Sequence, residues 1–270
     1  MNPPFKVRRG KSSHPASERQ LNRRPLKARG GVLEPTIFTI VGIVILIGFG
    51  IWQLDRRVWK ENLIATMTAR LDRAPANLAP RERWSSLTAA HDEFSRVAFP
   101  AEFLPGEEAL VYSAGSALRP DVKGAGYFVF APARLAGGSV VIVDRGFVPF
   151  DRKESASRAG SAPNRSVDIV GVLRWPETRG LFTPADDVKD NVWYLRDIAS
   201  VAAAKHWTNI APFYVDQEEP VPPGGWPKPG KLVVNLPNNH LQYAITWFGL
   251  ALALAGVYMV WLARRLLRLR

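Results

Sequence analysis

The sequence predicts a membrane protein: two transmembrane α-helices, with both termini cytoplasmic, flank a β-rich α+β domain outside the cytoplasm. Two uncharged runs support the helices, Ile37–Leu54 with 18 residues and Leu241–Ala263 with 23. At about 1.5 Å per residue, each approaches or exceeds the length needed to cross a hydrocarbon core of about 30 Å. Between them lie short runs rich in β-branched and aromatic residues, which are typical of strands.

The distribution of charge predicts the orientation. The net charge is +12, but residues 1–36 carry nine Lys/Arg and two Glu, and the tail 264–270 carries four Arg. The residues between them hold 23 basic and 22 acidic side chains, so no basic face for nucleic acid is expected. Positive flanks before the first span and after the second place both ends in the cytoplasm and residues 55–240 outside it.

The N-terminal arm, residues 1–36, is basic and is interrupted by Pro and Gly, so we expect a disordered cytoplasmic segment. A mitochondrial transit peptide is the alternative, since such peptides are also rich in Arg and poor in acids. The helix breakers argue against it, because a transit peptide acts as an amphipathic helix.

The run Ile37–Leu54 is predicted to be a retained span, because no small-residue cleavage site follows it. The apolar pattern continues to about Leu71, which indicates that the helix leaves the bilayer as one rod ended by Pro75 and Pro80. A short helix over 82–87 is expected after Pro80.

Strands are expected within residues 94–216, with a hairpin around Gly137-Gly138 and an Ala-rich helix from Asp197 to His206. The segment 218–230 contains five Pro and three Gly and is predicted to be a semi-rigid tether to the membrane. The expected strands are Phe94–Phe99, Leu110–Ser113, Tyr127–Ala131, Ser139–Asp144, Asp168–Trp175, Val192–Arg196 and Phe213–Asp216.

Most catalytic signatures are missing from the sequence. There is no cysteine, which excludes disulfides, thiolate metal sites and covalent haem attachment. No phosphate-binding loop, nucleophile elbow or paired-histidine metal motif occurs. His91-Asp92-Glu93 is interpreted as a solvated face. We therefore expect no enzymatic activity.

The second uncharged run has two unlike faces when it is wound as a helix. Gly249, Ala253 and Gly256 lie on one side, and we predict that these small residues contact the companion helix. The opposite side is predicted to be free for another partner. It carries His240, Tyr243, Trp247, Leu254, Tyr258 and Trp261.

Two other interpretations of that face stay open. Tyr258 and Trp261 are expected to be interfacial belt residues near the Arg tail. His240 is also consistent with a polar residue that satisfies the opening backbone groups of the helix, together with a capping Asn238.

Four stretches of the chain together resemble the surfeit locus family, the Shy-type assembly factors of cytochrome c oxidase. The resemblance extends from about Ile37 to Arg265, and Asp144 and Phe147 depart from the family pattern, which usually has Asn and Trp. The stretches are Gly50–Arg56 with Lys60 and Leu63-Ile64; Tyr127–Val129 with Val141–Pro149; Gly171–Arg174 with Phe182–Pro184 and Asn191–Trp193; and Asn238–Ala244 with Thr246–Leu250.

The resemblance implies an assembly factor that assists the delivery of haem a to subunit I of a haem–copper cytochrome c oxidase. It implies that His240 binds the haem iron, and Tyr243 and Trp247 would supply flat rings beside the macrocycle. Arg57 or Arg145 is a candidate partner for the haem propionates. The alternative is a membrane-anchored scaffold for oxidase assembly that does not bind haem.

The expected partners are oxidase subunit I, other factors such as haem a synthase, and membrane lipid, with no nucleic acid. The expected location is the bacterial inner (plasma) membrane with the main domain periplasmic. A mitochondrial inner membrane is the less favoured alternative.

Overall fold

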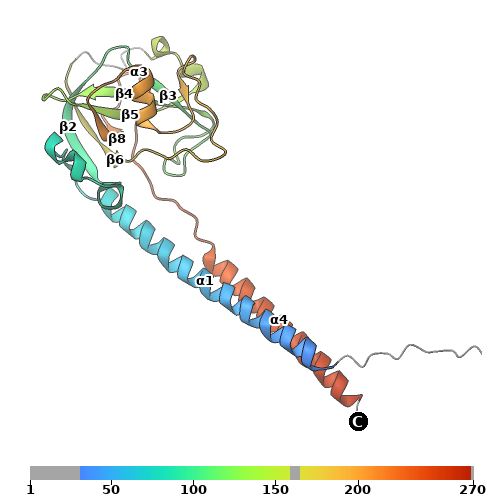
Figure 1. Ribbon diagram of the computed structural model, residues 1–270. Coiled ribbons are helices and arrows are strands. Elements are labelled where there is room, and N and C mark those ends of the chain that lie inside the picture. Colours follow the sequence, from blue (N-terminus) through green and yellow to red (C-terminus); the bar gives the residue numbers. More distant parts are fainter. Residues whose placement is uncertain (1–30, 159–164, 269–270) are drawn as a thin grey trace, which may run out of the picture. The chain divides into compact units, whose positions relative to one another are not determined.

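The computed structural model describes residues 31–158 and 165–268, so the predicted disorder of the first thirty residues lies outside the described residues. The chain divides into two compact units, of which one comprises the chain up to Ile47 together with Phe248 onward. The other, Gly48–Trp247, contains the remaining parts of the two long helices and a sheet domain (Figure 1).

Helix α1, Leu33–Leu71, is 39 residues long, and helix α4, His240–Leu267, is 28 residues long. Among the described residues these are the two helices that are long and apolar enough to cross a membrane. The predicted continuation to Leu71 is confirmed. Helix α1 begins within the predicted arm, and α4 extends past the predicted 263 boundary into the basic tail.

Seven of the buried or half-buried positions of α4 follow one another at intervals of three and four residues, and Phe248, Ala255, Gly256 and Leu262 are half-buried as well. Such spacing marks a packing seam between two helices. Helix α1 shows the same spacing from Thr36 to Leu71. The seam positions of α4 are His240, Ala244, Trp247, Ala251, Leu254, Tyr258 and Trp261.

Contacts within each unit show which face of α4 is covered. In the first unit the Tyr258 hydroxyl bonds the hydroxyl of Thr36, and a Cβ added to Gly42 would lie 3.1 Å from a methyl group of Leu254. A Cβ at Gly249 or Gly256 would meet nothing within 4 Å. The predicted orientation of α4 is therefore wrong: the ring-bearing face packs on α1, and the small residues that admit it include Gly42 of α1.

The Gly48–Trp247 unit holds eight strands, and the predicted strands are all present with shifted ends (Figure 1). They are β1 (Ala76–Asn77), β2 (Arg96–Phe103), β3 (Ala109–Ser113), β4 (Gly126–Arg134), β5 (Val140–Pro149), β6 (Val167–Arg174), β7 (Val192–Trp193) and β8 (Ile210–Glu219). The short helices are η1 (Arg81–Ser86), α2 (Ala89–Asp92), η2 (Phe150–Arg152), η3 (Ser155–Ser157) and α3 (Ile198–Lys205).

Five of the strands close on themselves. The order β2-β6-β8-β5-β4 returns to β2 through the pairing of Glu102 with Arg134 and of Phe103 with Ala133. Most pairings are antiparallel, as predicted for an α+β domain, but β5 and β8 run parallel. Closure removes the free edges that an open sheet would leave, and it makes the centre of the domain a small barrel.

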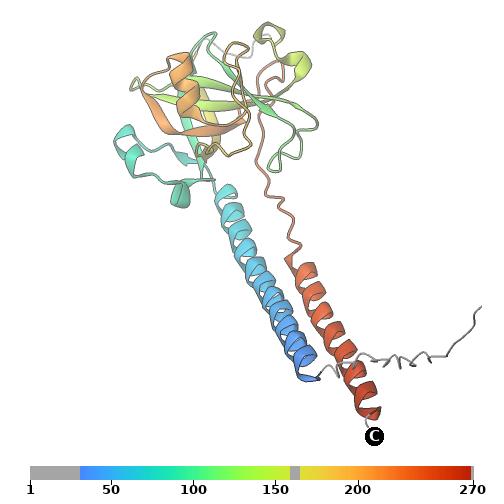
Figure 2. The same cartoon turned by 45° about the vertical axis from the view of Figure 1, so that its right-hand side comes forward.

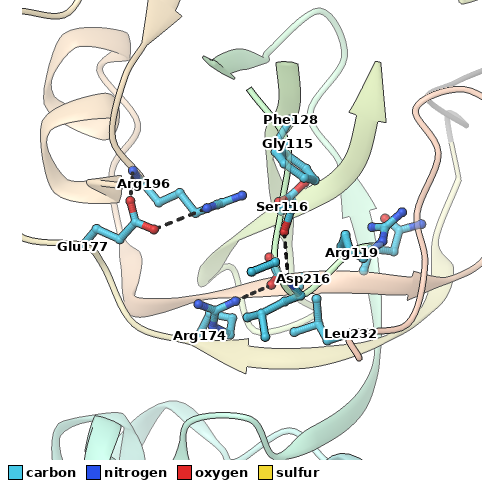
Figure 3. A pocket seen from close by; sticks show the side chains of 13 residues that line it. Gly115, Ser116, Arg119, Phe128, Arg174, Glu177, Arg196, Asp216 and Leu232 are labelled. Carbon is cyan, nitrogen blue, oxygen red and sulfur yellow. Dashed lines mark hydrogen bonds and ion pairs between the residues drawn. The ribbon is translucent and has the colours of Figure 1, made fainter. Parts of the chain in front are cut away.

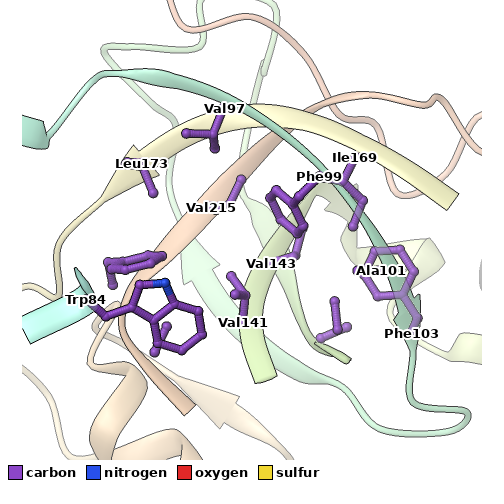
Figure 4. Packing of buried hydrophobic residues seen from close by; sticks show 14 residues of the cluster. Trp84, Val97, Phe99, Ala101, Phe103, Val141, Val143, Ile169, Leu173 and Val215 are labelled. Carbon is purple, nitrogen blue, oxygen red and sulfur yellow. The ribbon is translucent and has the colours of Figure 1, made fainter. Parts of the chain in front are cut away.

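The barrel interior is filled by alternate side chains of all five strands, including Val97, Val141, Ile169 and Val215 (Figure 4). Trp84 of η1 packs into the same cluster, with its ring centroid 5.4 Å from that of Phe213. The barrel interior is therefore an apolar core. A second cluster is formed by residues of β3, β4, β5, β7, β8 and helix α3. Helix α3, orange in Figure 2, lies against the sheet.

Asp197 caps α3 as predicted, because its carboxylate accepts a hydrogen bond from the Ser200 N–H at 3.2 Å. The predicted tether 218–230 behaves differently. It starts inside β8, and Lys228 then exchanges backbone hydrogen bonds of 3.1 and 2.8 Å with Phe147. Gly146, at φ 112°, has no room for a Cβ beside the Lys228 carbonyl. The segment is thus fixed along the domain.

Candidate functional site

His240 opens helix α4 and lies beside Gln53 of α1. The imidazole Nδ1 is 2.7 Å from the amide oxygen of Gln53. That oxygen only accepts hydrogen bonds, so Nδ1 donates to it, and in the uncharged tautomer that carries this hydrogen Nε2 keeps a lone pair. Among the described residues Nε2 has no hydrogen-bond partner. A neutral imidazole oriented in this way is a typical haem or metal ligand.

The segment that leads into His240 is also tied to α1. The Lys60 ammonium donates to the Pro237 carbonyl at 2.5 Å. Asn238 does not act as the expected cap, because its Oδ1 is buried without a partner in the described part of the chain. The alternative interpretation, in which the polar residues before α4 satisfy the first backbone groups of that helix, is therefore not supported for Asn238.

Tyr243 and Trp247 do not form one surface with His240. Tyr243 is 56% exposed, whereas the Trp247 ring lies against Phe49 with centroids 5.0 Å apart. Phe49 covers part of the Trp247 ring, so that part is not open to a macrocycle. His240, Tyr243 and Trp247 fit a haem in one respect: Nε2 of His240 is a nitrogen donor without a hydrogen-bond partner among the described residues.

Both arginines that were candidate partners for the haem propionates are engaged in other contacts. Arg145 is 3% exposed and lies over the Phe103 ring at 4.5 Å, inside the domain. Arg57 pairs with Glu61 one turn further along α1, at 2.7 Å. No group of three or more His, Cys, Asp or Glu that could hold a metal ion occurs among residues 31–158 and 165–268.

A polar cavity of about 250 Å³ lies in the domain, where loop 115–119 covers strands β5, β6 and β8 (Figure 3). Asp144 of β5 and Asp216 of β8 are paired residues of neighbouring strands. Asp216 accepts a hydrogen bond from Arg174 at 2.9 Å, and Arg196 bonds Glu177 at 3.3 Å across the mouth.

Burial and the neighbouring Asp216 raise the pKa of Asp144 to about 8. Its Oδ1 accepts the Gly146 N–H at 2.9 Å, which offsets part of that cost. Burial, followed by the charge of Asp216, also raises the pKa of Tyr214, so the phenol stays protonated. Two acids sharing a buried site hold at least one proton at neutral pH.

Several polar atoms at this cavity have no partner among the described residues. They are Asp216 Oδ1, Gln217 Oε1 and Arg196 Nε, which form no hydrogen bond there. The cavity is large enough for water molecules that could satisfy these groups. Its lining includes the cationic Arg119, Arg174 and Arg196 and the acidic Glu177, Asp144 and Asp216.

Sequence reasoning found His240 and missed Gln53, Asp216 and Arg196. Gln53 carried a usable signal, because it is the one amide within the first uncharged run and a polar group there requires a partner. Asp216 and Arg196 carried none, since only the pairing of β5 with β8 places them beside Asp144.

The chain is similar in sequence to proteins of one family. The family model described as SURF1 family matches residues 40–252. A SURF1-like protein of Monosiga brevicollis is 34% identical over 247 residues, covering 88% of this chain and 90% of the relative. A SURF1-like protein of Rickettsia felis is 28% identical over 85% of this chain and 97% of its own length.

Surfeit locus protein 1 of Homo sapiens is 31% identical over 220 residues, which cover 76% of this chain and 70% of that protein. The family match covers well over half of the chain and includes helix α1 from Ile40 and the first half of α4. The chain belongs to the SURF1 family.

Proposed function

We propose that this chain is a membrane-anchored assembly factor for a haem–copper cytochrome c oxidase, and that it assists the delivery of haem a to subunit I. Membership of the family supports the assembly role, since the surfeit locus resemblance implies it. The chain acts in this proposal as a carrier and not as an enzyme.

The observation that carries the haem part is the free Nε2 of His240. The Gln53 amide oxygen holds the other ring nitrogen at 2.7 Å, which leaves one donor for an axial position. Haem a, when bound, is the redox cofactor of the oxidase, and here it is cargo. A single protein ligand without a covalent attachment favours release to a recipient, because less binding energy must be lost on transfer.

The membrane placement is part of the same proposal. Helices α1 and α4 have the length and composition for spans, and basic residues follow α4 in sequence. We place both termini in the cytoplasm and the sheet domain in the periplasm of a bacterial inner membrane. Haem a synthase and oxidase subunits are then the expected partners there.

The test is the visible spectrum of the full chain purified from cells that make haem a. A Soret band is expected in the native chain and should disappear in His240→Ala. Gln242→Ala is the matched control, because Gln242 is an exposed polar residue in the same helical turn. Pigment in none of the three proteins would favour the second candidate.

That second candidate is a scaffold that organises oxidase assembly without binding haem. It is favoured by the packing of Trp247 on Phe49, which covers part of the face that was expected to meet the macrocycle. The scaffold requires a docking surface on the domain, and such a surface would serve either candidate.

A further inference from the structure

Two large apolar side chains project from the domain into solvent. Leu181 and Phe182 are each 98% exposed, more than any other large hydrophobic residue among the described ones. Other exposed apolar side chains of the domain, such as Val188 at 53% and Val221 at 61%, are smaller and less exposed. Two adjacent and fully exposed apolar side chains form a contiguous apolar tip, and contiguous exposed apolar surface is typical of interaction sites.

The backbone presents these two residues as the centre of a tight turn. The Thr183 N–H donates to the Gly180 carbonyl at 3.2 Å, and the Gly180 N–H donates to the Thr183 hydroxyl oxygen at 3.0 Å. These bonds close a four-residue turn whose two middle positions are Leu181 and Phe182. Both side chains therefore point away from the loop that supports them.

The base of the turn is clamped. The Arg179 guanidinium donates to the Pro184 carbonyl at 2.6 Å and pairs with the Asp186 carboxylate. Asp186 also accepts the Tyr194 N–H at 3.0 Å. The loop is thereby joined to the end of β7, so the turn is formed before any partner binds. A preformed element loses little conformational entropy on binding.

The surrounding charge identifies the kind of partner. Residues 176–191 contain four acidic side chains (Glu177, Asp186, Asp187, Asp190) and two basic ones (Arg179, Lys189). Glu177 pairs with Arg196 and Asp186 with Arg179, which leaves Asp187 and Asp190 beside the single Lys189. Loops that enter a membrane surface carry an excess of Lys or Arg, because cellular membranes expose anionic lipids. An acidic loop with an apolar tip is complementary to an apolar pocket with a basic rim on a protein.

We propose that the Leu181–Phe182 turn is a docking element that inserts into an apolar, basic-rimmed pocket of a partner protein. The identity of that partner as an oxidase component rests on the proposed function. The insertion itself does not depend on haem.

The experiment replaces Phe182 with a photo-crosslinking phenylalanine analogue in the full chain, in cells that produce the oxidase. Val221, exposed on the same domain, is the control position. We expect a discrete cross-linked product from position 182 that reacts with antibodies to an oxidase subunit. Its yield should fall at least about fivefold with Leu181→Ser, the loss typical of one anchoring side chain.

Asp190→Lys separates the protein pocket from lipid. It should lower the yield of the protein product, because the basic rim would be repelled, and it should not create a lipid product. Cross-links to phospholipid alone, or products identical to those from Val221, overturn the proposal. Solubility and the apparent unfolding temperature should not change in these variants, because the side chains are exposed.

The same preparations keep the two proposals distinguishable. If His240→Ala abolishes the Soret band while the cross-link at position 182 persists, docking and haem binding are independent. A retained Soret band without a cross-link overturns the docking element alone.

Discussion

Asp144 is a buried acid whose protonation links the sheet domain to pH. Its folded pKa of about 8 exceeds the ordinary value of 3.8, first through burial and then through the charge of Asp216. Between these values the folded chain holds a proton that the unfolded chain has lost. The free energy of unfolding therefore falls as the pH rises through this range.

Asp144→Asn removes the titration and keeps an oxygen that can accept the Gly146 N–H. We expect the variant to gain stability relative to the native chain as the pH rises from about 5 to about 8, by about 1–3 kcal/mol. The measurement is the apparent unfolding temperature of the full chain in detergent. Asp168→Asn, at an exposed position, is the control, and a gain that does not vary with pH would contradict this account.

Gln53 acts through His240. Gln53→Leu removes the acceptor of the Nδ1 hydrogen, so the ring loses its fixed orientation. If the proposed site is correct, retention of haem a should fall about tenfold. Gln53→Glu keeps an acceptor and should retain the pigment with a shifted absorption maximum. Gln242→Leu is the matched control; equal pigment in Gln53→Leu and the native chain would exclude this role.

At the scale of elements, the pairing of α1 with α4 depends on which helix contributes small residues to the contact between them. Gly42→Val should lower the apparent unfolding temperature, since the added side chain meets Leu254 and overpacking costs about 1–3 kcal/mol. Gly249→Val should have no such effect, because nothing lies within 4 Å of that position. The reverse ranking in a thermal unfolding series would restore the orientation predicted from sequence.

Local patterns predicted the elements well. The β-rich runs on either side of Gly137-Gly138, the turn between them and the capping Asp197 all reflect interactions between near neighbours, and the hairpin β4–β5 and helix α3 are confirmed. The face of α4 was predicted wrongly because small residues occur on both helices. The positions of these small residues in the sequence do not show which helix packs its small residues against the large side chains of the other.

At the scale of the whole molecule, barrel closure and the polar cavity could not be predicted. Closure depends on the contact of Phe103 with Ala133, and the cavity on the parallel pairing of β5 with β8, both between segments distant in sequence. The two helices were predictable, since each contains a long uncharged run, a pattern that is local in the sequence.

Orientation in the membrane has its own test. A reporter that is active only outside the cytoplasm should be active when it is fused near Gly160 and inactive when it is fused after Arg270, as the basic flanks require. An inactive Gly160 fusion with an active Arg270 fusion would reverse the orientation argued from charge.

The most direct test of the central claim is the visible spectrum of the native chain and of His240→Ala, both purified from cells that make haem a. Our account predicts a Soret band that vanishes with the imidazole while the unfolding temperature stays unchanged. A band of equal strength in both proteins, or in neither, would contradict haem ligation by His240.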